Sequence, residues 1–143
     1  MISERRKQEE LTTRFGRILD NSSNEIYVFD ASTLHFIQVN SGARENLGYS
    51  MDELTHMTPL SFKPEYTLET FEKLIEPLRS GKKSVIGFET VHKRKDGMLY
   101  PVEVKLQLMH KETPPVFIAV IQDITMRKQT EEKLGQYRDH LEE

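Results

Sequence analysis

The sequence predicts an α+β fold: a five-stranded antiparallel sheet, helices inserted between strands two and three, and a flanking helix at each end. Two observations support this. Apolar residues recur at the 3.6-residue helical period near both ends and over residues 67–79, but alternate with a period of two beyond residue 84. Turn residues separate the alternating runs, among them Asp96-Gly97, a dipeptide that favours the positive φ of hairpin turns.

The first half of the chain predicts a charged helix, then a hairpin, then short helices. Residues 3–20 are highly charged with a narrow apolar stripe. Residues 26–29 and 35–39 are β-prone and lie on either side of small polar residues that suit a turn. Asn40 can cap a short helix that Gly48 would end.

The second half predicts three consecutive antiparallel strands and a last helix. Residues 101–109 alternate between apolar and polar, as expected for a strand with one buried and one wet face. Residues 116–121 are apolar throughout, which predicts a central strand covered on both faces. We therefore divide the chain into an N-terminal connector helix (1–19), a core domain (20–124) and a C-terminal helix (125–143).

Composition narrows the functional classes. At 143 residues the chain suits one core, and its net charge of -3 lacks the basic excess of a nucleic-acid binder. It has no cysteine, so disulfides, thiolate metal sites and cysteine nucleophiles are excluded. With no run of about 18 apolar residues and no leader-like N-terminus, we expect no membrane contact from this segment and a cytoplasmic location.

Several short motifs, in this order and at these separations, resemble the PAS family of sensory domains over residues 20–127. They are Asn40 with Ala43, Leu47-Gly48-Tyr49-Ser50 before Asp52-Glu53-Leu54, Arg94-Lys95-Asp96-Gly97 before Pro101-Val102-Glu103-Val104, and Asp123-Ile124-Thr125 with Arg127. The resemblance implies a non-catalytic sensory box of bacterial signal transduction. Such a domain biases an attached output, either a two-component histidine kinase or a diguanylate cyclase.

The segment from residue 123 to residue 127 resembles the family's junction between the last strand and the outgoing signalling helix. By that resemblance Asp123, Thr125 and Arg127 take a signal-transfer role. A physical reason supports it, because Asp or Thr at a strand-to-helix corner can bond the free N–H groups of the helix start. The alternative is that these residues only cap the helix.

The N-terminus resembles the end of a preceding PAS domain. Residues 2–5 are similar to residues 124–127, and a Glu-Glu pair follows each segment. This similarity implies neighbouring PAS domains in a tandem array, with both terminal helices acting as connectors. Chance similarity between two charged helices is the alternative.

The family's ligand motifs are not matched, so the cofactor is unknown. By spacing, the photoreactive cysteine falls on Pro59 and the flavin-sensing glutamine on Ile121, which excludes a cysteinyl-flavin adduct. Haem is not expected, because residues 67–79 hold no histidine. Any pocket would be apolar, with Tyr27, Tyr49 and Tyr66 as polar anchors and Ile121 as a fourth lining residue, and a side-chain-filled core without ligand is the alternative.

Titratable residues give no catalytic or metal-binding pattern. His35, His92, His110 and His140 show no metal-ligand spacing, and we interpret them as ordinary surface or sheet residues. Two glutamates flank the hairpin turn, Glu89 and Glu103, and invite an acid/base interpretation, yet a cross-strand surface role is the better one. We therefore predict that the chain is not an enzyme and holds no metal.

The flanking helices predict a homodimer. The apolar seam consists of Leu11, Phe15 and Ile18 at the front and Leu134, Tyr137 and Leu141 at the back. Alternatively, the front set packs on the domain's own sheet. Two rival functions remain, a ligand-free PAS dimerisation or relay domain and a small cone-shaped α+β enzyme, and strand order separates the enzyme from the PAS fold.

Overall fold

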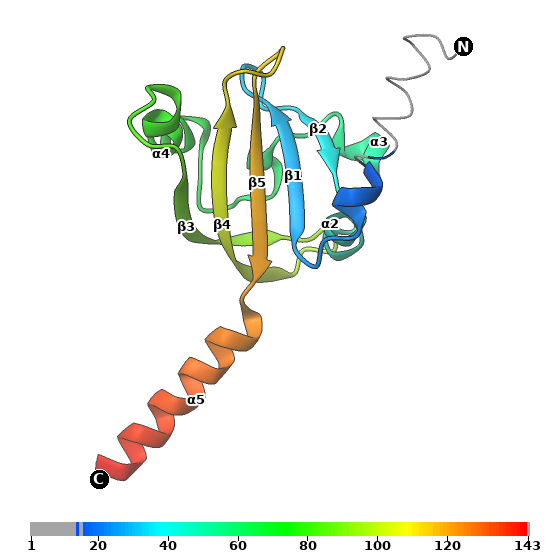
Figure 1. The fold of residues 1–143 in the computed structure, drawn as a ribbon. Coiled ribbons are helices and arrows are strands. Elements are labelled where there is room, and N and C mark those ends of the chain that lie inside the picture. Colours follow the sequence, from blue (N-terminus) through cyan, green and yellow to red (C-terminus); the bar gives the residue numbers. More distant parts are fainter. Residues whose placement is uncertain (1–13, 15, 143) are drawn as a thin grey trace.

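The computed structural model describes residue 14 and residues 16–142. Its centre is a five-stranded antiparallel sheet in the order β2-β1-β5-β4-β3. The strands are β1 (Glu25–Asp30), β2 (Phe36–Val39), β3 (Ile86–Lys93), β4 (Leu99–Met109) and β5 (Val116–Asp123). The last strand lies in the middle of the sheet, between β1 and β4 (Figure 1). This order confirms the predicted fold class.

The helices between strands two and three begin and end where their capping residues predict. They are α2 (Ser41–Leu47), α3 (Met51–Leu54), the 3-10 turn η1 (Pro59–Phe62) and α4 (Leu68–Arg79). Asn40 caps α2 by accepting a hydrogen bond from the Ala43 N–H, and Gly48 ends it with a φ of 87°. Reciprocal bonds between Ser50 and Glu53 form a capping box at the start of α3.

Asn40 also ties the helical layer to the sheet. Its Oδ1 accepts from the Ile26 N–H at 2.9 Å, and its Nδ2 donates to the carbonyls of Leu19 at 3.0 Å and Asn24 at 2.9 Å. The side chain is fully buried, so each of these bonds replaces a bond to water that burial removed. A residue predicted as a helix cap therefore also fixes the start of β1 beside α2.

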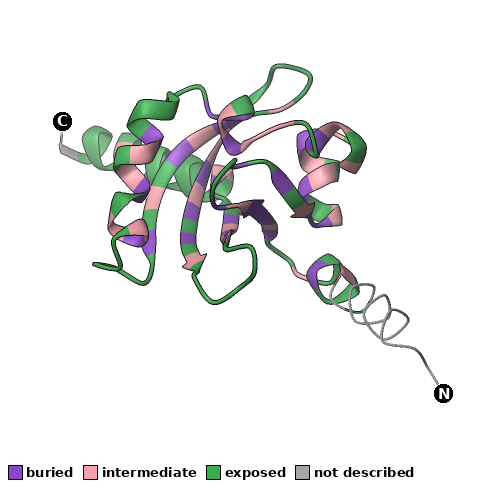
Figure 2. Cartoon of the chain, turned by 90° about the horizontal axis from the view of Figure 1, so that it is seen from above, coloured by how far each residue is buried: buried purple, intermediate pink, exposed green. Residues whose placement is uncertain are grey.

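The hydrophobic core lies between the helices and one face of the sheet. Figure 2 shows the alternation of buried and exposed positions along the strands. In β5, Phe117, Ala119 and Ile121 are buried, while Val116 and its alternate neighbours are half-buried. The prediction that residues 116–121 are covered on both faces is therefore wrong for the described part of the chain, because the described helices between β2 and β3 cover one face.

The C-terminal helix α5 (Thr125–Glu142) begins at the predicted residue and extends away from the sheet (Figure 1). Its predicted seam residues are exposed: Leu134 at 57%, Tyr137 at 63% and Leu141 at 66%. Of the front set, Ile18 is exposed, whereas Leu11 and Phe15 lie outside the described residues. Among the helices of the described chain, none is long and apolar enough to cross a membrane. The dimer remains a prediction.

Candidate functional site

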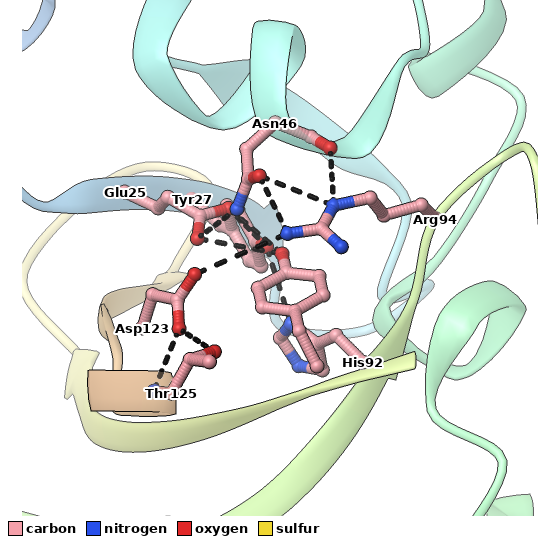
Figure 3. A network of polar contacts seen from close by, with 8 residues as sticks. Glu25, Tyr27, Asn46, His92, Arg94, Asp123 and Thr125 are labelled. Atoms are coloured by element: carbon pink, nitrogen blue, oxygen red, sulfur yellow. Dashed lines mark hydrogen bonds and ion pairs between the residues drawn. The ribbon is translucent and has the colours of Figure 1, made fainter. Parts of the chain in front are cut away.

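A cluster of polar side chains lies where β1 begins, β5 ends and the β3–β4 hairpin approaches α2 (Figure 3). We call it the junction network. Its members are Glu25, Tyr27, Asn46, His92, Arg94, Tyr100, Asp123 and Thr125. In the described chain, every buried side-chain nitrogen and oxygen has a hydrogen-bond partner. The network is therefore fully satisfied as it stands.

Glu25 is the centre of the junction network. It is 8% exposed, and its carboxylate accepts from Tyr27 Oη at 3.3 Å, Tyr100 Oη at 3.1 Å and Asn46 Nδ2 at 3.2 Å. Burial raises the pKa of Glu25, and the hydrogen bonds from Asn46 and the two tyrosines offset part of that rise. A nearby Asp123 carboxylate adds to the upward shift of this pKa. The protonation of Glu25 is therefore coupled to three strands and α2.

Arg94 links Glu25's neighbour Asn46 to the end of β5. Its Nε donates to the Asn46 carbonyl at 3.1 Å, and its Nη2 donates to Asn46 Oδ1 at 3.0 Å. The guanidinium lies 4.2 Å from the Tyr100 ring centroid, a cation–π contact that fixes its plane. The same Nη2 is 4.0 Å from Asp123 Oδ2. A shift of Asn46 therefore changes the position of a charge beside Asp123.

Asp123 joins the network to α5. Its Oδ1 accepts from the Thr125 backbone N–H at 2.9 Å and from Thr125 Oγ1 at 2.5 Å. The capping contact expected at this corner is thus present, and it satisfies a free N–H group at the start of the helix. This capping contact completes a continuous chain of contacts that runs from the buried Glu25 through Asn46, Arg94 and Asp123 to the first turn of α5.

His92 and Lys63 extend the network into the core. His92 is fully buried, with Nδ1 3.4 Å from Tyr27 Oη and Nε2 2.5 Å from Lys63 Nζ. Burial lowers the pKa of His92 well below its ordinary value, and the Lys63 charge lowers it further. Burial also lowers the pKa of Lys63 to about 7.

His92 is a sheet residue, as one of the two interpretations had it, but it is not a surface residue, because the helices cover the face of β3 that carries it. The sequence contained a signal for this. In β3, His92 shares the alternation of Ile86 and Phe88, which point toward the core. For Lys63, which follows the buried Phe62 at the end of η1, no periodic pattern gave a comparable signal.

Arg127 lies on the other face of the sheet. Glu89 of β3 and Glu103 of β4 are directly opposite each other, and Arg127 bridges them, with its Nη1 3.3 Å from Glu103 Oε2 and Nη2 bonded to Glu89. Lys128 Nζ also contacts Glu89 at 3.2 Å. The hydrogen bond from Lys128 lowers the pKa of Glu89. The cross-strand surface role expected for the two glutamates is confirmed, with α5 supplying the counter-charges.

The four predicted pocket residues do not share one cavity. Tyr27 borders an internal cavity of about 10 Å³, room for about one water molecule, which is also bordered by Lys63, Phe71 and Phe88. Tyr66 packs edge-on against these two phenylalanines. Tyr49 stacks on a third ring, that of Phe62. A partly open hollow of about 380 Å³ lies outside the core, and Ile121, Glu25 and Asp123 are among its walls. No three potential metal ligands gather among the described residues.

Comparison with known proteins gives the same class of domain. The PAS domain family profile matches residues 24–126. A sensor of Methanosarcina acetivorans described as methyl sulfide methyltransferase-associated is 27% identical over 124 residues, covering 86% of this chain and 12% of that protein. The chain thus spans about an eighth of that relative's length.

Solved structures agree. The PAS domain of an HTR-like protein from Haloarcula marismortui is 28% identical with a TM-score of 0.68, over 81% of this chain and 99% of that one. A PAS domain from a two-component sensor histidine kinase has a TM-score of 0.67 over the same shares, at 18% identity, and supports the fold alone. The fold and the capped outgoing helix are those of a sensory domain. The chain belongs to the PAS domain family.

Proposed function

We propose that this PAS domain is a non-catalytic relay that passes a rearrangement in its core to an output domain through α5. The observation that carries the proposal is the unbroken set of contacts from Glu25 through Asn46 and Arg94 to Asp123 and Thr125. Asp123 holds the first turn of α5, so a change in its surroundings acts directly on the base of the helix.

Support for an output domain comes from α5 itself. The helix has 18 residues, and its exposed Leu134, Tyr137 and Leu141 follow the three-then-four spacing of a coiled-coil seam. We infer that two copies pair along this seam and that a histidine kinase core, in the cytoplasm, receives the signal. The relative from Methanosarcina acetivorans is itself described as a sensor. A diguanylate cyclase output and neighbouring PAS domains fit the same arrangement.

One observation favours a second candidate, a relay without a small-molecule ligand. The internal cavity of about 10 Å³ is far smaller than the several hundred cubic ångströms of a cofactor pocket. In that case the input is a partner domain. A ligand-linked input instead requires a second arrangement of the core that the ligand binds more tightly.

Native mass spectrometry of freshly purified protein, followed by denaturing mass spectrometry, separates these candidates. A small added mass that denaturation removes supports a ligand and gives its mass. A bare dimer supports the ligand-free relay. A bare monomer contradicts pairing through α5, and Leu134→Lys is the matched variant, because a charge in the seam should convert dimer to monomer.

The relay itself is tested in a fusion that joins α5 in register to a histidine kinase core. Asn46→Ala removes the side-chain contacts to Glu25 and Arg94, so we expect it to change the autophosphorylation rate. Asp52→Ala on the exposed start of α3 is the control and should leave that rate unchanged. Equal rates for all three proteins would contradict the proposed relay.

A further inference from the structure

Lys63 is a buried amine with an unusual partner. It is 4% exposed, and its Nζ lies 2.5 Å from His92 Nε2. In the part of the chain that the structure describes, no carboxylate forms an ion pair with this Nζ within 4.0 Å. A buried ammonium group without a counter-ion is costly, so its charge must be compensated at a distance or its proton must leave.

The direction of each hydrogen bond follows from the chemistry of the groups. A lysine ammonium can only donate, so His92 Nε2 accepts from it, and the neutral ring then carries its hydrogen on Nδ1. That N–H donates to Tyr27 Oη at 3.4 Å, and the Tyr27 hydroxyl donates to Glu25 Oε1 at 3.3 Å. Lys63, His92, Tyr27 and Glu25 thus form one chain of hydrogen bonds, the core chain, with a cation at one end and an anion at the other.

The core chain has a second arrangement with the same atoms. If Lys63 gives its proton to His92 Nε2, the Nδ1 proton passes to the Tyr27 oxygen and the Tyr27 proton passes to Glu25 Oε1. The products are a neutral amine and a neutral carboxylic acid, and all three hydrogen bonds now run in the opposite direction. One proton is relocated, and no other reactant is needed. In a low-dielectric interior, the neutral arrangement avoids two buried charges.

The Glu25 end of the core chain is the start of the contacts that reach α5. A carboxylate accepts strongly from Asn46 Nδ2 and repels Asp123, whereas a neutral acid does neither to the same extent. Asn46 is held by Arg94, whose Nη2 lies 4.0 Å from Asp123. The charge on Glu25 therefore biases the groups that hold the first turn of α5.

We propose that the core chain is a proton-linked switch, in which the two charge arrangements of Lys63 and Glu25 favour different positions of α5. This inference rests on the proposed relay through α5, and it identifies proton relocation between Lys63 and Glu25 as the event that starts the relay. It requires that the proton be exchangeable under ordinary conditions. The pKa of Lys63, lowered by burial to about 7, meets that requirement, and the raised pKa of Glu25 favours its neutral form.

Other charged groups near the core chain are few and placed at its ends. Lys63 faces His92 on β3, and the nearby Glu65 is bonded to Thr90 Oγ1 at 2.6 Å. Around Glu25 lie Tyr100 on β4, Asp123 on β5, and, beyond Asn46, the Arg94 guanidinium. Since Asp123 raises the pKa of Glu25, the pair cannot both be charged without cost, which reinforces the coupling.

The test is a pH titration of the intact chain by NMR, following the Lys63 side chain and the amides of Thr125 and Arg127 together. Relocation within the core chain changes no proton count, so pH acts on it only by removing the proton that Lys63 and Glu25 share. Below about pH 7 one of the two groups holds that proton, and above that value neither does. In the wild type we therefore expect the α5 amides to shift with the same midpoint as Lys63, about 7. In Tyr27→Phe, which removes the connecting hydroxyl but keeps the ring, Lys63 should still titrate while the shift of the α5 amides is lost. Tyr49→Phe is the control: it removes a tyrosine hydroxyl outside both the core chain and the junction network and keeps the ring that stacks on Phe62, so the α5 shift should remain.

Two results would overturn the switch. One is an α5 junction that does not respond while Lys63 titrates in the wild type. The other is an α5 response of the same size in Tyr27→Phe, which would mean that the charge of Lys63 acts through space. Either result leaves the relay itself open to its own test, because Asn46→Ala in the kinase fusion does not depend on pH.

Discussion

Two polar clusters hold the base of α5, and they differ in burial. The junction network is buried around Glu25, at 8% exposure, and His92, at 0%, and becomes solvated toward α5, where 38% of the Asp123 side chain is exposed. The outer cluster, formed by Arg127, Lys128, Glu89 and Glu103, is solvated, and about two-fifths of the Arg127 side chain is exposed. Water can replace a lost partner in the outer cluster but cannot do so around the buried Glu25 and His92. We therefore expect the contacts of the junction network to determine the stability of the fold and the coupling of its core to α5. The contacts of the outer cluster should add only a salt-sensitive restraint on the position of α5.

The largest effect is expected at the centre of the inner network. Glu25→Leu leaves the hydroxyls of Tyr27 and Tyr100 and the Asn46 amide without their acceptor, at a cost of about 3 kcal/mol in the free energy of unfolding. Urea unfolding measures this loss. Glu25→Gln keeps one acceptor oxygen and should lose clearly less; equal losses would mean that the shape of the side chain, and not its hydrogen bonds, matters.

The next effect has the opposite sign. Lys63→Met removes a buried charge while keeping an apolar chain of similar length, so we expect about 2 kcal/mol of stabilisation below neutral pH. The pKa of Lys63 is about 7 in the fold against an ordinary 10.5. Between these values the unfolded chain binds more protons, so wild-type stability should rise with pH across that range.

Stability measured by urea at several pH values checks the sign. The advantage of Lys63→Met should be greatest below about pH 7 and fall steadily as the pH rises toward 10.5, the ordinary pKa of the amine. A constant advantage at every pH would mean that folding does not lower the pKa of Lys63, and a destabilised variant would mean that its bond to His92 outweighs the cost of burial.

A smaller effect is expected at the strand-to-helix corner. Asp123→Ala removes the acceptor for the Thr125 N–H, and loss of such a cap costs about 1 kcal/mol. The loss should be local, seen as faster hydrogen exchange in the first turn of α5. Asp123→Asn retains an acceptor oxygen and should restore most of the protection. If both variants exchange like the wild type, Asp123 does not hold the helix.

The smallest effect is expected in the outer cluster. Arg127→Gln removes the bridge between Glu89 and Glu103, which then repel each other across the two strands. Because these side chains are solvated, the fall in melting temperature should be slight and should disappear in high salt. A large fall that persists in high salt would show that the outer cluster, and not the inner network, secures α5.

The sequence predicted the fold well because its local signals are strong. Asn40 and Gly48 bound α2 through capping chemistry that depends on near neighbours, and the alternation in residues 101–109 matches the inner and outer faces of β4. The corner at Asp123 was predicted for the same reason. The four pocket residues were not brought together, because aromatic side chains from η1, α4 and the sheet fill the space between them.

The inner network was missed because its contacts are distant in sequence. Glu25 and Tyr100 are 75 residues apart, and Lys63 and His92 are 29 apart. Helical or strand periodicity places a residue on a face but does not say which polar groups meet there. The buried lysine is the clearest case, because composition favours an exposed position for any lysine and only the packing of η1 against β3 reverses that expectation.

The most direct measurement of coupling is a double-mutant cycle on the opening of the first turn of α5. Hydrogen exchange of the α5 amides is compared in the wild type, Asn46→Ala, Asp123→Ala and the double variant. If the buried network acts on α5 as one unit, the two substitutions are non-additive by about 0.5 kcal/mol or more. Additive effects, within about 0.3 kcal/mol, would contradict coupling between the core and the outgoing helix.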